Sequence, residues 1–179
     1  MNENEKKAVI DMFVAMNTNF AVQDEVRVKQ IMEKFFRDFT GGVQKEPAYF
    51  YDLLETAFLE KSPDDVEFSL IAVGSFGYLT TEYIGLLIKL MDSDWHHEHE
   101  TIASIFQDFK SPETVDCLYR AALKEFEYLA YDDAHALAIK CIWALLEIHT
   151  EEAREKLELL AQSDIEAIRE RALKRLGEF

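Results

Sequence analysis

The spacing of apolar residues is the feature that most restricts the fold of this 179-residue chain. Apolar side chains recur at intervals of three and four along almost its whole length, and no stretch keeps the strict alternation of a half-buried strand. One example is the stripe formed by Val28, Ile31, Phe35 and Phe39. Six glycines and three prolines are too few for the many turns of a β-sandwich or barrel. We therefore expect an all-α fold of about ten antiparallel helices with short connections.

Turn and cap residues divide the pattern into helices. Gly41 and Gly42 predict a helix stop, because glycine adopts the left-handed conformation at no steric cost. Short oxygen side chains are expected to cap the first turns of the later helices. We expect the helix after residue 62 to run to about Leu79 and to include Gly74–Gly77. The expected helix starts lie at Ser62-Pro63, Thr80-Thr81, Ser93-Asp94, Ser111-Pro112, Asp132-Asp133, Thr150 and a capping box at 163–166.

The helices also repeat in pairs. Asp65, Asp94, Asp133 and Asp164 each precede the second helix of a pair, at spacings of 29, 39 and 31 residues. Such periods are typical of helix-pair repeats, with a plain helical bundle as the alternative. We expect residues 1–45 to form an N-terminal helical cap and residues 46–179 to form the repeats, within a single domain overall.

The last repeat resembles the HEAT-like family. In that family the inner helix reads Asp-x-x-aliphatic-Arg-x-x-Ala-x-x-x-Leu-Gly, and the matching residues here are Arg169, Ala172, Leu176 and Gly177. The upstream units match in period and in the leading Asp, so the resemblance covers about residues 47–179. It implies an α-solenoid of helical hairpins whose concave face is built from the second helices.

The charge is strongly segregated along the chain. The formal net charge is −16, and residues 46–133 contain nineteen acidic and five basic residues, whereas residues 1–45 are balanced. A chain this acidic is repelled by phosphate backbones, so direct nucleic-acid binding is not expected. A basic protein steered onto the middle repeats would offset the self-repulsion. The alternative is a generic acidic surface.

Acidic residues gather at successive repeat junctions, where equivalent positions of a solenoid stack along one edge. We expect a carboxylate ridge there that binds Lys and Arg of a partner, although each acid near a helix start has capping as an alternative role. Aromatic residues beside the acids are candidate binding anchors or half-buried loop residues. The predicted partner-binding residues are Asp64, Asp65, Glu67, Asp92, Asp94, Trp95, Glu98, Glu125, Glu127, Tyr128, Tyr131, Asp132 and Asp133.

The segment 95–100 is the best candidate for catalysis. It holds three histidines and two glutamates, and His96 and Glu100 are four residues apart, so they would share a helix face and could hold a metal. His99-Glu100 resembles the His-Glu dyads of HEAT-repeat iron hydroxylases, but those enzymes need several facing dyads, and the equivalent helix starts of the other repeats lack them. A metal-dependent enzyme is therefore an alternative, and we expect no enzymatic activity, metal or other cofactor.

The remaining motifs favour a cytoplasmic protein without catalytic chemistry. No secretory signal is recognised at the start, and no apolar run approaches the ~18 residues of a membrane span. Cys117 and Cys141 lie in apolar helical patterns, so two free buried thiols in a reducing compartment are expected. Gly74-Ser75-Phe76-Gly77 lacks the Gly-x-Ser-x-Gly spacing of a nucleophile elbow and is interpreted as a close helix contact.

In size, predicted fold and charge the chain resembles immunity proteins of contact-dependent and polymorphic bacterial toxin systems, some of which are HEAT-like. The resemblance implies a stoichiometric inhibitor that covers the active-site cleft of a basic, nuclease-type toxin. The alternative in the same class of binding proteins is a general cytosolic scaffold or adaptor.

Overall fold

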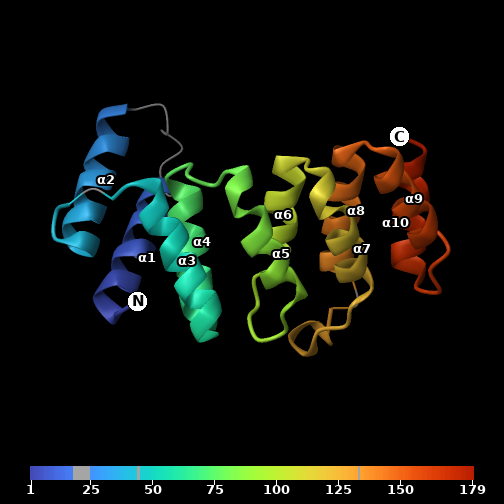
Figure 1. Ribbon diagram of the computed structural model, residues 1–179, viewed down its shortest axis with the longest axis horizontal. Helices are drawn as coiled ribbons and strands as arrows, with labels where there is room; N and C mark the ends of the chain where they lie inside the picture. The colour runs from blue at the N-terminus through green and yellow to red at the C-terminus, as the bar shows by residue number, and fades with distance from the viewer. Residues whose placement is uncertain (18–24, 44, 133) are drawn as a thin grey trace. The chain divides into compact units, whose positions relative to one another are not determined.

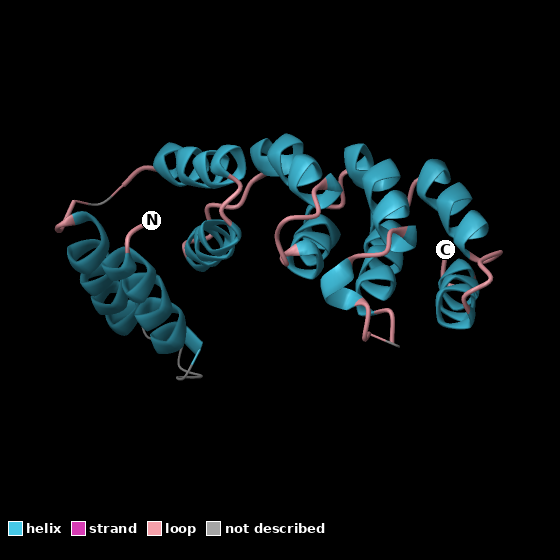
Figure 2. Cartoon of the chain, turned by 90° about the horizontal axis from the view of Figure 1, so that it is seen from below, coloured by secondary structure: helices cyan, strands magenta, loops and turns pink. Residues whose placement is uncertain are grey.

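The computed structural model describes residues 1–17, 25–43, 45–132 and 134–179. These residues form ten α-helices and three 3₁₀ helices and contain no strand (Figures 1 and 2). The predicted all-α fold is therefore confirmed. The chain divides into two compact units, Met1–Leu79 and Thr80–Phe179, and each is described by itself.

The first unit contains α1 (Glu3–Asn17), α2 (Glu25–Thr40), α3 (Pro47–Glu60) and α4 (Pro63–Ser75). Helix α1 packs on both α2 and α4, and α3 packs on α4. An aromatic cluster forms around Phe76, whose ring lies 4.9 to 5.6 Å from the rings of Phe35, Phe36, Phe50 and Tyr78. These contacts are within the usual range for aromatic pairs and explain the many phenylalanines near the start of the chain.

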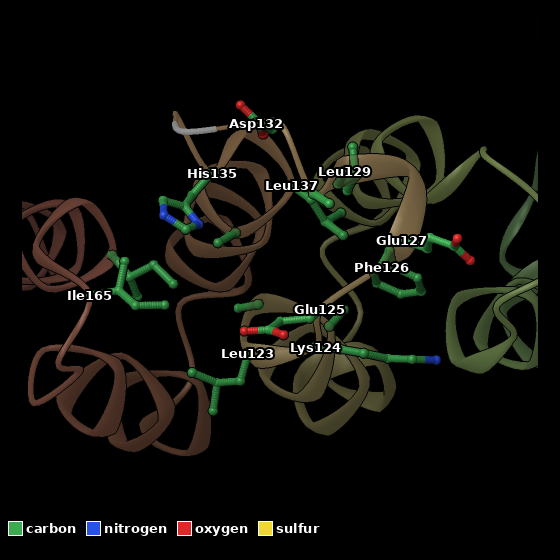
Figure 3. Close-up of a pocket in the computed structure, with 15 residues that line it drawn as sticks. Leu123, Lys124, Glu125, Phe126, Glu127, Leu129, Asp132, His135, Leu137 and Ile165 are labelled. Atoms are coloured by element: carbon green, nitrogen blue, oxygen red, sulfur yellow. The ribbon is translucent and has the colours of Figure 1, made fainter.

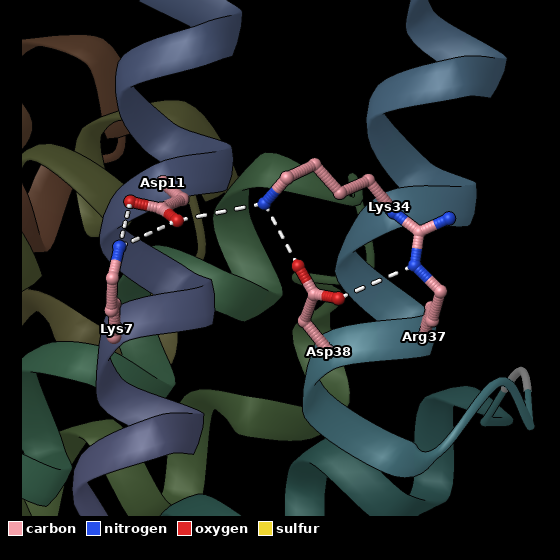
Figure 4. Close-up of polar contacts among 5 residues, drawn as sticks. All are labelled: Lys7, Asp11, Lys34, Arg37 and Asp38. Carbon is pink, nitrogen blue, oxygen red and sulfur yellow. Dashed lines mark hydrogen bonds and ion pairs between the residues drawn. The ribbon is translucent and has the colours of Figure 1, made fainter.

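A chain of alternating charges joins α1 to α2 (Figure 4). Asp11 pairs with Lys7 at 2.8 Å and with Lys34 of α2 at 3.5 Å. Lys34 pairs in turn with Asp38 at 2.8 Å, and Asp38 with Arg37 at 3.4 Å. Because these charges pair with one another, they help to align the two helices and leave little net charge to attract a partner.

The second unit contains six α-helices that pack in a regular order. They are α5 (Ile84–Asp92), α6 (His99–Phe109), α7 (Val115–Leu123), α8 (Ala136–Ile148), α9 (Glu151–Leu160) and α10 (Glu166–Leu176). Three pairs of consecutive helices pack together: α5 on α6, α7 on α8, and α9 on α10. Neighbouring pairs also touch, because α7 contacts both α5 and α9, and α8 contacts both α6 and α10. Helix α8 contacts four helices, which explains why seven of its residues are buried. The 3₁₀ helices Thr81–Tyr83, Pro112–Thr114 and Glu127–Leu129 lie in the connections.

Several predicted helix boundaries are wrong. Helix α4 ends at Ser75, close to Gly77 with its left-handed φ of 66°. Gly74 and Ser75 are therefore the last residues of the helix, and Phe76 and Gly77 lie beyond it. Helix α6 begins at His99 and α8 at Ala136, several residues after the Asp-rich positions expected to start them.

The predicted side-chain caps are also mostly wrong. Among the described helices after residue 46, Thr150 is the one N-cap whose side chain accepts a hydrogen bond from the first turn, at 3.2 Å from the Ala153 N–H. The expected capping box at 163–166 does not form, because Ile165 occupies the N-cap position and Ser163 accepts from the Ile165 N–H instead.

None of the described helices is both long enough and apolar enough to cross a lipid bilayer.

Candidate functional site

Two connections of the second unit lie side by side, the α5–α6 loop (93–98) and the α7–α8 segment (124–135). The Lys124 ammonium donates to the carbonyl oxygens of Asp92 and Ser93, at 2.8 and 3.4 Å. The Arg120 guanidinium holds the Asp92 carboxylate with two bonds of 2.8 and 3.0 Å from one nitrogen and a third of 3.3 Å. Figure 1 shows both connections at the lower edge of this unit, in lime and gold. The structure therefore brings two of the predicted acidic junctions together.

A buried histidine pair holds the two connections against each other. The rings of His96 and His99 are stacked, with centroids 4.4 Å apart. His99 Nδ1 lies 2.9 Å from the hydroxyl of Tyr128 in the neighbouring segment, and its Nε2 lies 2.9 Å from the Ser93 carbonyl. His96 Nε2 lies 2.8 Å from the Leu90 carbonyl, and its Nδ1 accepts from the Glu98 N–H at 3.0 Å.

These partners fix the tautomer that each neutral ring adopts. A carbonyl can only accept, so each Nε2 carries the hydrogen and each Nδ1 is the acceptor. Burial lowers the pKa of both histidines, that of His99 to about 4, and the Lys124 ammonium acts in the same direction. Both rings are therefore neutral near pH 7 and serve to join the two connections.

The same contacts bear on the metal-site alternative at 96–100. All four ring nitrogens of His96 and His99 are engaged in hydrogen bonds. His96 precedes α6, so it does not share a helix face with Glu100, and Glu100 pairs with Lys140 at 3.2 Å. Within the part of the chain that the structure describes, no three His, Cys, Asp or Glu side chains gather where they could hold a metal ion.

The predicted acidic residues of the second unit fall into two groups. Asp92 is paired with Arg120, and the Asp132 carboxylate accepts from the N–H groups of Ala134 and Ala136, at 3.1 and 2.6 Å. Asp132 thus stabilises the start of α8, so its role is helix capping, the alternative to partner binding that the sequence predicts. The second group has carboxylates that are at least partly exposed and form no ion pair with any described residue: Asp94, Glu98, Glu125 and Glu127.

The predicted acids before residue 80 belong to the first unit. Lys6 pairs with Asp64 at 3.2 Å and with Asp65 at 3.5 Å, and the Met1 amino group lies 2.8 Å from Asp65. Burial acts to raise the pKa of Asp65, but these cations outweigh it and hold the pKa below its usual range. Glu67 is exposed on α4. Asp133 lies outside the described residues.

The three predicted aromatic anchors play different parts. Trp95 is half-buried and packs edge-on against His96, at 5.1 Å between ring centroids. Tyr128 is half-buried and bonded to His99, so both rings stabilise the connections from within. Tyr131 is 96% exposed and is available to a partner.

A cavity of about 540 Å³ with a mixed polar and apolar lining lies beneath the α7–α8 segment and was missed by sequence reasoning (Figure 3). The segment crosses between the end of α7, the start of α8 and the start of α10, where several alanines leave space. The local signal was the extra length of the 94–133 repeat, whose inserted residues form the cover. Its lining residues are Ala121, Ala122, Leu123, Lys124, Glu125, Phe126, Glu127, Leu129, Ala130, Asp132, His135, Leu137, Ala138, Ile165 and Ile168.

Comparison of the chain with protein-family models, curated proteins and solved structures finds no match.

Proposed function

We propose that this protein is an acidic binding protein with HEAT-like repeats of antiparallel helical hairpins over residues 46–179 and an N-terminal helical cap over residues 1–45. The pattern of contacts between helices supports the predicted solenoid. Helix α7 packs between α5 and α9, and α8 packs between α6 and α10. Stacked helix pairs have this pattern, in which each pair contacts its neighbours.

The observation that carries the binding function is the gathering of unpaired carboxylates at one edge. Asp94 and Glu98 in one connection lie beside Glu125 and Glu127 in the other, because His99 bonds to Tyr128 across the gap. Unpaired carboxylates on two adjoining connections give this edge a net negative charge, which attracts a partner bearing Lys and Arg. We call these four residues the acidic edge.

The partner class follows from charge and chemistry. A net charge of −16 steers the protein toward a strongly basic macromolecule, and nucleic-acid-cleaving toxins are basic because they bind phosphate. We infer an immunity protein that covers the active-site cleft of such a toxin in the cytoplasm, binding without catalysis or cofactor. An interface of roughly 1,600 Å² is the usual size for such complexes.

The experiment compares two triple variants with equal charge change. Asp94, Glu125 and Glu127 are replaced by Lys in one, and the exposed Glu60, Glu155 and Glu170 in the control. Basic proteins captured by the wild type are purified, and Kd and inhibition of their activity are measured for all three forms. We expect loss of at least about 100-fold in affinity for the first variant and less than about threefold for the control.

Two results would contradict the proposal. One is that no basic protein binds with nanomolar affinity. The other is that both triple variants weaken binding equally, because net charge and not the acidic edge then controls the interaction. A captured partner without toxic activity would support a scaffold or adaptor instead.

A further inference from the structure

The cavity beneath the α7–α8 segment has an apolar floor. Ala121 and Ala122 of α7, Leu137 and Ala138 of α8, and Ile168 of α10 are all buried and all line it. Its volume of about 540 Å³ lies within the range of roughly 300–1,000 Å³ that holds bound ligands, so it has room for a bulky side chain and part of its neighbours.

The rim of the cavity combines exposed apolar groups with carboxylates. Leu123 is 47% exposed and Ile165 is 38% exposed, and Figure 3 shows them on separate sides of the space. Of the charged residues that line it, Glu125 lies across the space, whereas the Glu127 and Asp132 side chains point outward (Figure 3). The Lys124 side chain extends away to the Asp92 and Ser93 carbonyls. A cavity with an apolar floor, with Glu125 at its mouth and in a chain of net charge −16, favours an apolar group that carries cations beside it.

We infer that this cavity receives an aromatic side chain flanked by Lys or Arg in a segment of the basic partner. The inference rests on the proposed function and explains how the protein would distinguish one basic partner from another. The acidic edge attracts any basic surface, whereas the cavity accepts only a surface that carries a suitable aromatic anchor. Buried aromatic anchors surrounded by charged contacts are typical of binding hot spots. Tyr131, which is exposed, belongs to the segment that covers the cavity.

The test uses a fluorescein-labelled peptide, Lys-Lys-Gly-Trp-Gly-Lys-Lys, and two matched peptides. One has Ala in place of Trp, and the other has Glu in place of every Lys. Fluorescence anisotropy gives Kd at low ionic strength. We expect the Trp peptide to bind about tenfold tighter than the Ala peptide, because indole surface leaves water, and the Glu peptide not to bind.

Two double variants test whether the cavity is the site. Leu123→Gln with Ile165→Gln changes its rim, and Leu159→Gln with Leu173→Gln is the control, since these leucines are 49% and 56% exposed and do not line it. We expect the rim variant to weaken the Trp peptide about fivefold or more and to leave the Ala peptide unchanged. The control should bind both peptides as the wild type does.

The outcomes separate the cavity from the acidic edge. If Trp and Ala peptides bind equally and only the Asp94, Glu125 and Glu127 replacements weaken both, the cavity inference is overturned and the proposed function stands. If the Glu peptide binds as well as the Lys peptides, both fail. If sedimentation shows a wild-type dimer that the rim variant loses, the occupant is a second copy of this chain, and the inference is overturned.

Discussion

Replacing His99 by Gln should remove a defined part of the acid sensitivity of the second unit. Burial lowers the pKa of His99 from 6.5 to about 4, so the unfolded chain binds a proton that the folded protein excludes. The contribution of His99 to the free energy of unfolding is therefore fully present above pH 6.5. It falls as the pH drops from 6.5 to about 4 and does not change further below that value. The difference corresponds to about 3 kcal/mol.

The groups that surround His99 also favour its neutral form. His96 stacks on one face, Lys124 contributes positive charge, and the Tyr128 hydroxyl and Ser93 carbonyl occupy the two nitrogens. A proton added at Nδ1 would lose the hydrogen bond from the Tyr128 O–H unless that hydroxyl turned to accept. Gln does not titrate, and its amide can still donate to Ser93.

Tryptophan fluorescence isolates the relevant unit, because both tryptophans, Trp95 and Trp143, lie within Thr80–Phe179. Urea unfolding from pH 7.5 to 4.5 should show the wild type losing about 2 kcal/mol more than His99→Gln over this range, because the range ends above the folded pKa of about 4. The control is His97→Gln, whose side chain is exposed, and it should follow the wild type. Parallel curves for wild type and His99→Gln would refute the buried, neutral assignment of His99.

Three further predictions follow from single contacts. Tyr128→Phe should destabilise the second unit by about 1 kcal/mol in urea, since it removes the hydroxyl bonded to His99. Gly77→Ala should lower the free energy of unfolding because its φ is 66°, whereas Gly85→Ala, within α5 and with open space around its Cα, should raise it, each by about 1 kcal/mol in urea unfolding. Cys117 and Cys141 are buried, and burial raises the pKa of both thiols; they should react with a disulfide reagent only after unfolding, and rapid native labelling would be the contrary result.

The helical fold was predictable because its signal is local. An apolar stripe at spacings of three and four is buried wherever its helix packs, and Phe35, Leu118 and Leu145 are all buried as their stripes predict. Boundaries were less predictable, because they depend on contacts beyond the helix itself. Asp132 illustrates this, since its carboxylate accepts from Ala136 across a short turn and delays the start of α8.

The candidate site was predictable only in part. Acidic residues at the α5–α6 and α7–α8 junctions could be found by counting charges, and these junctions do lie together. The partners that neutralise some of them could not be found, because Arg120 reaches Asp92 across 28 residues and Lys6 reaches Asp64 across 58. The cavity is a tertiary feature, formed where α7, α8 and α10 leave space beside small side chains, and has no motif.

Hydrogen–deuterium exchange on the complex with the captured basic partner tests the central claim most directly, because it locates the interface without any substitution. The account predicts slower exchange at 93–98 and 124–132, with little change in the helices of the first unit. Protection confined to Met1–Leu79, or absent from both connections, would contradict the assignment of the acidic edge as the binding surface.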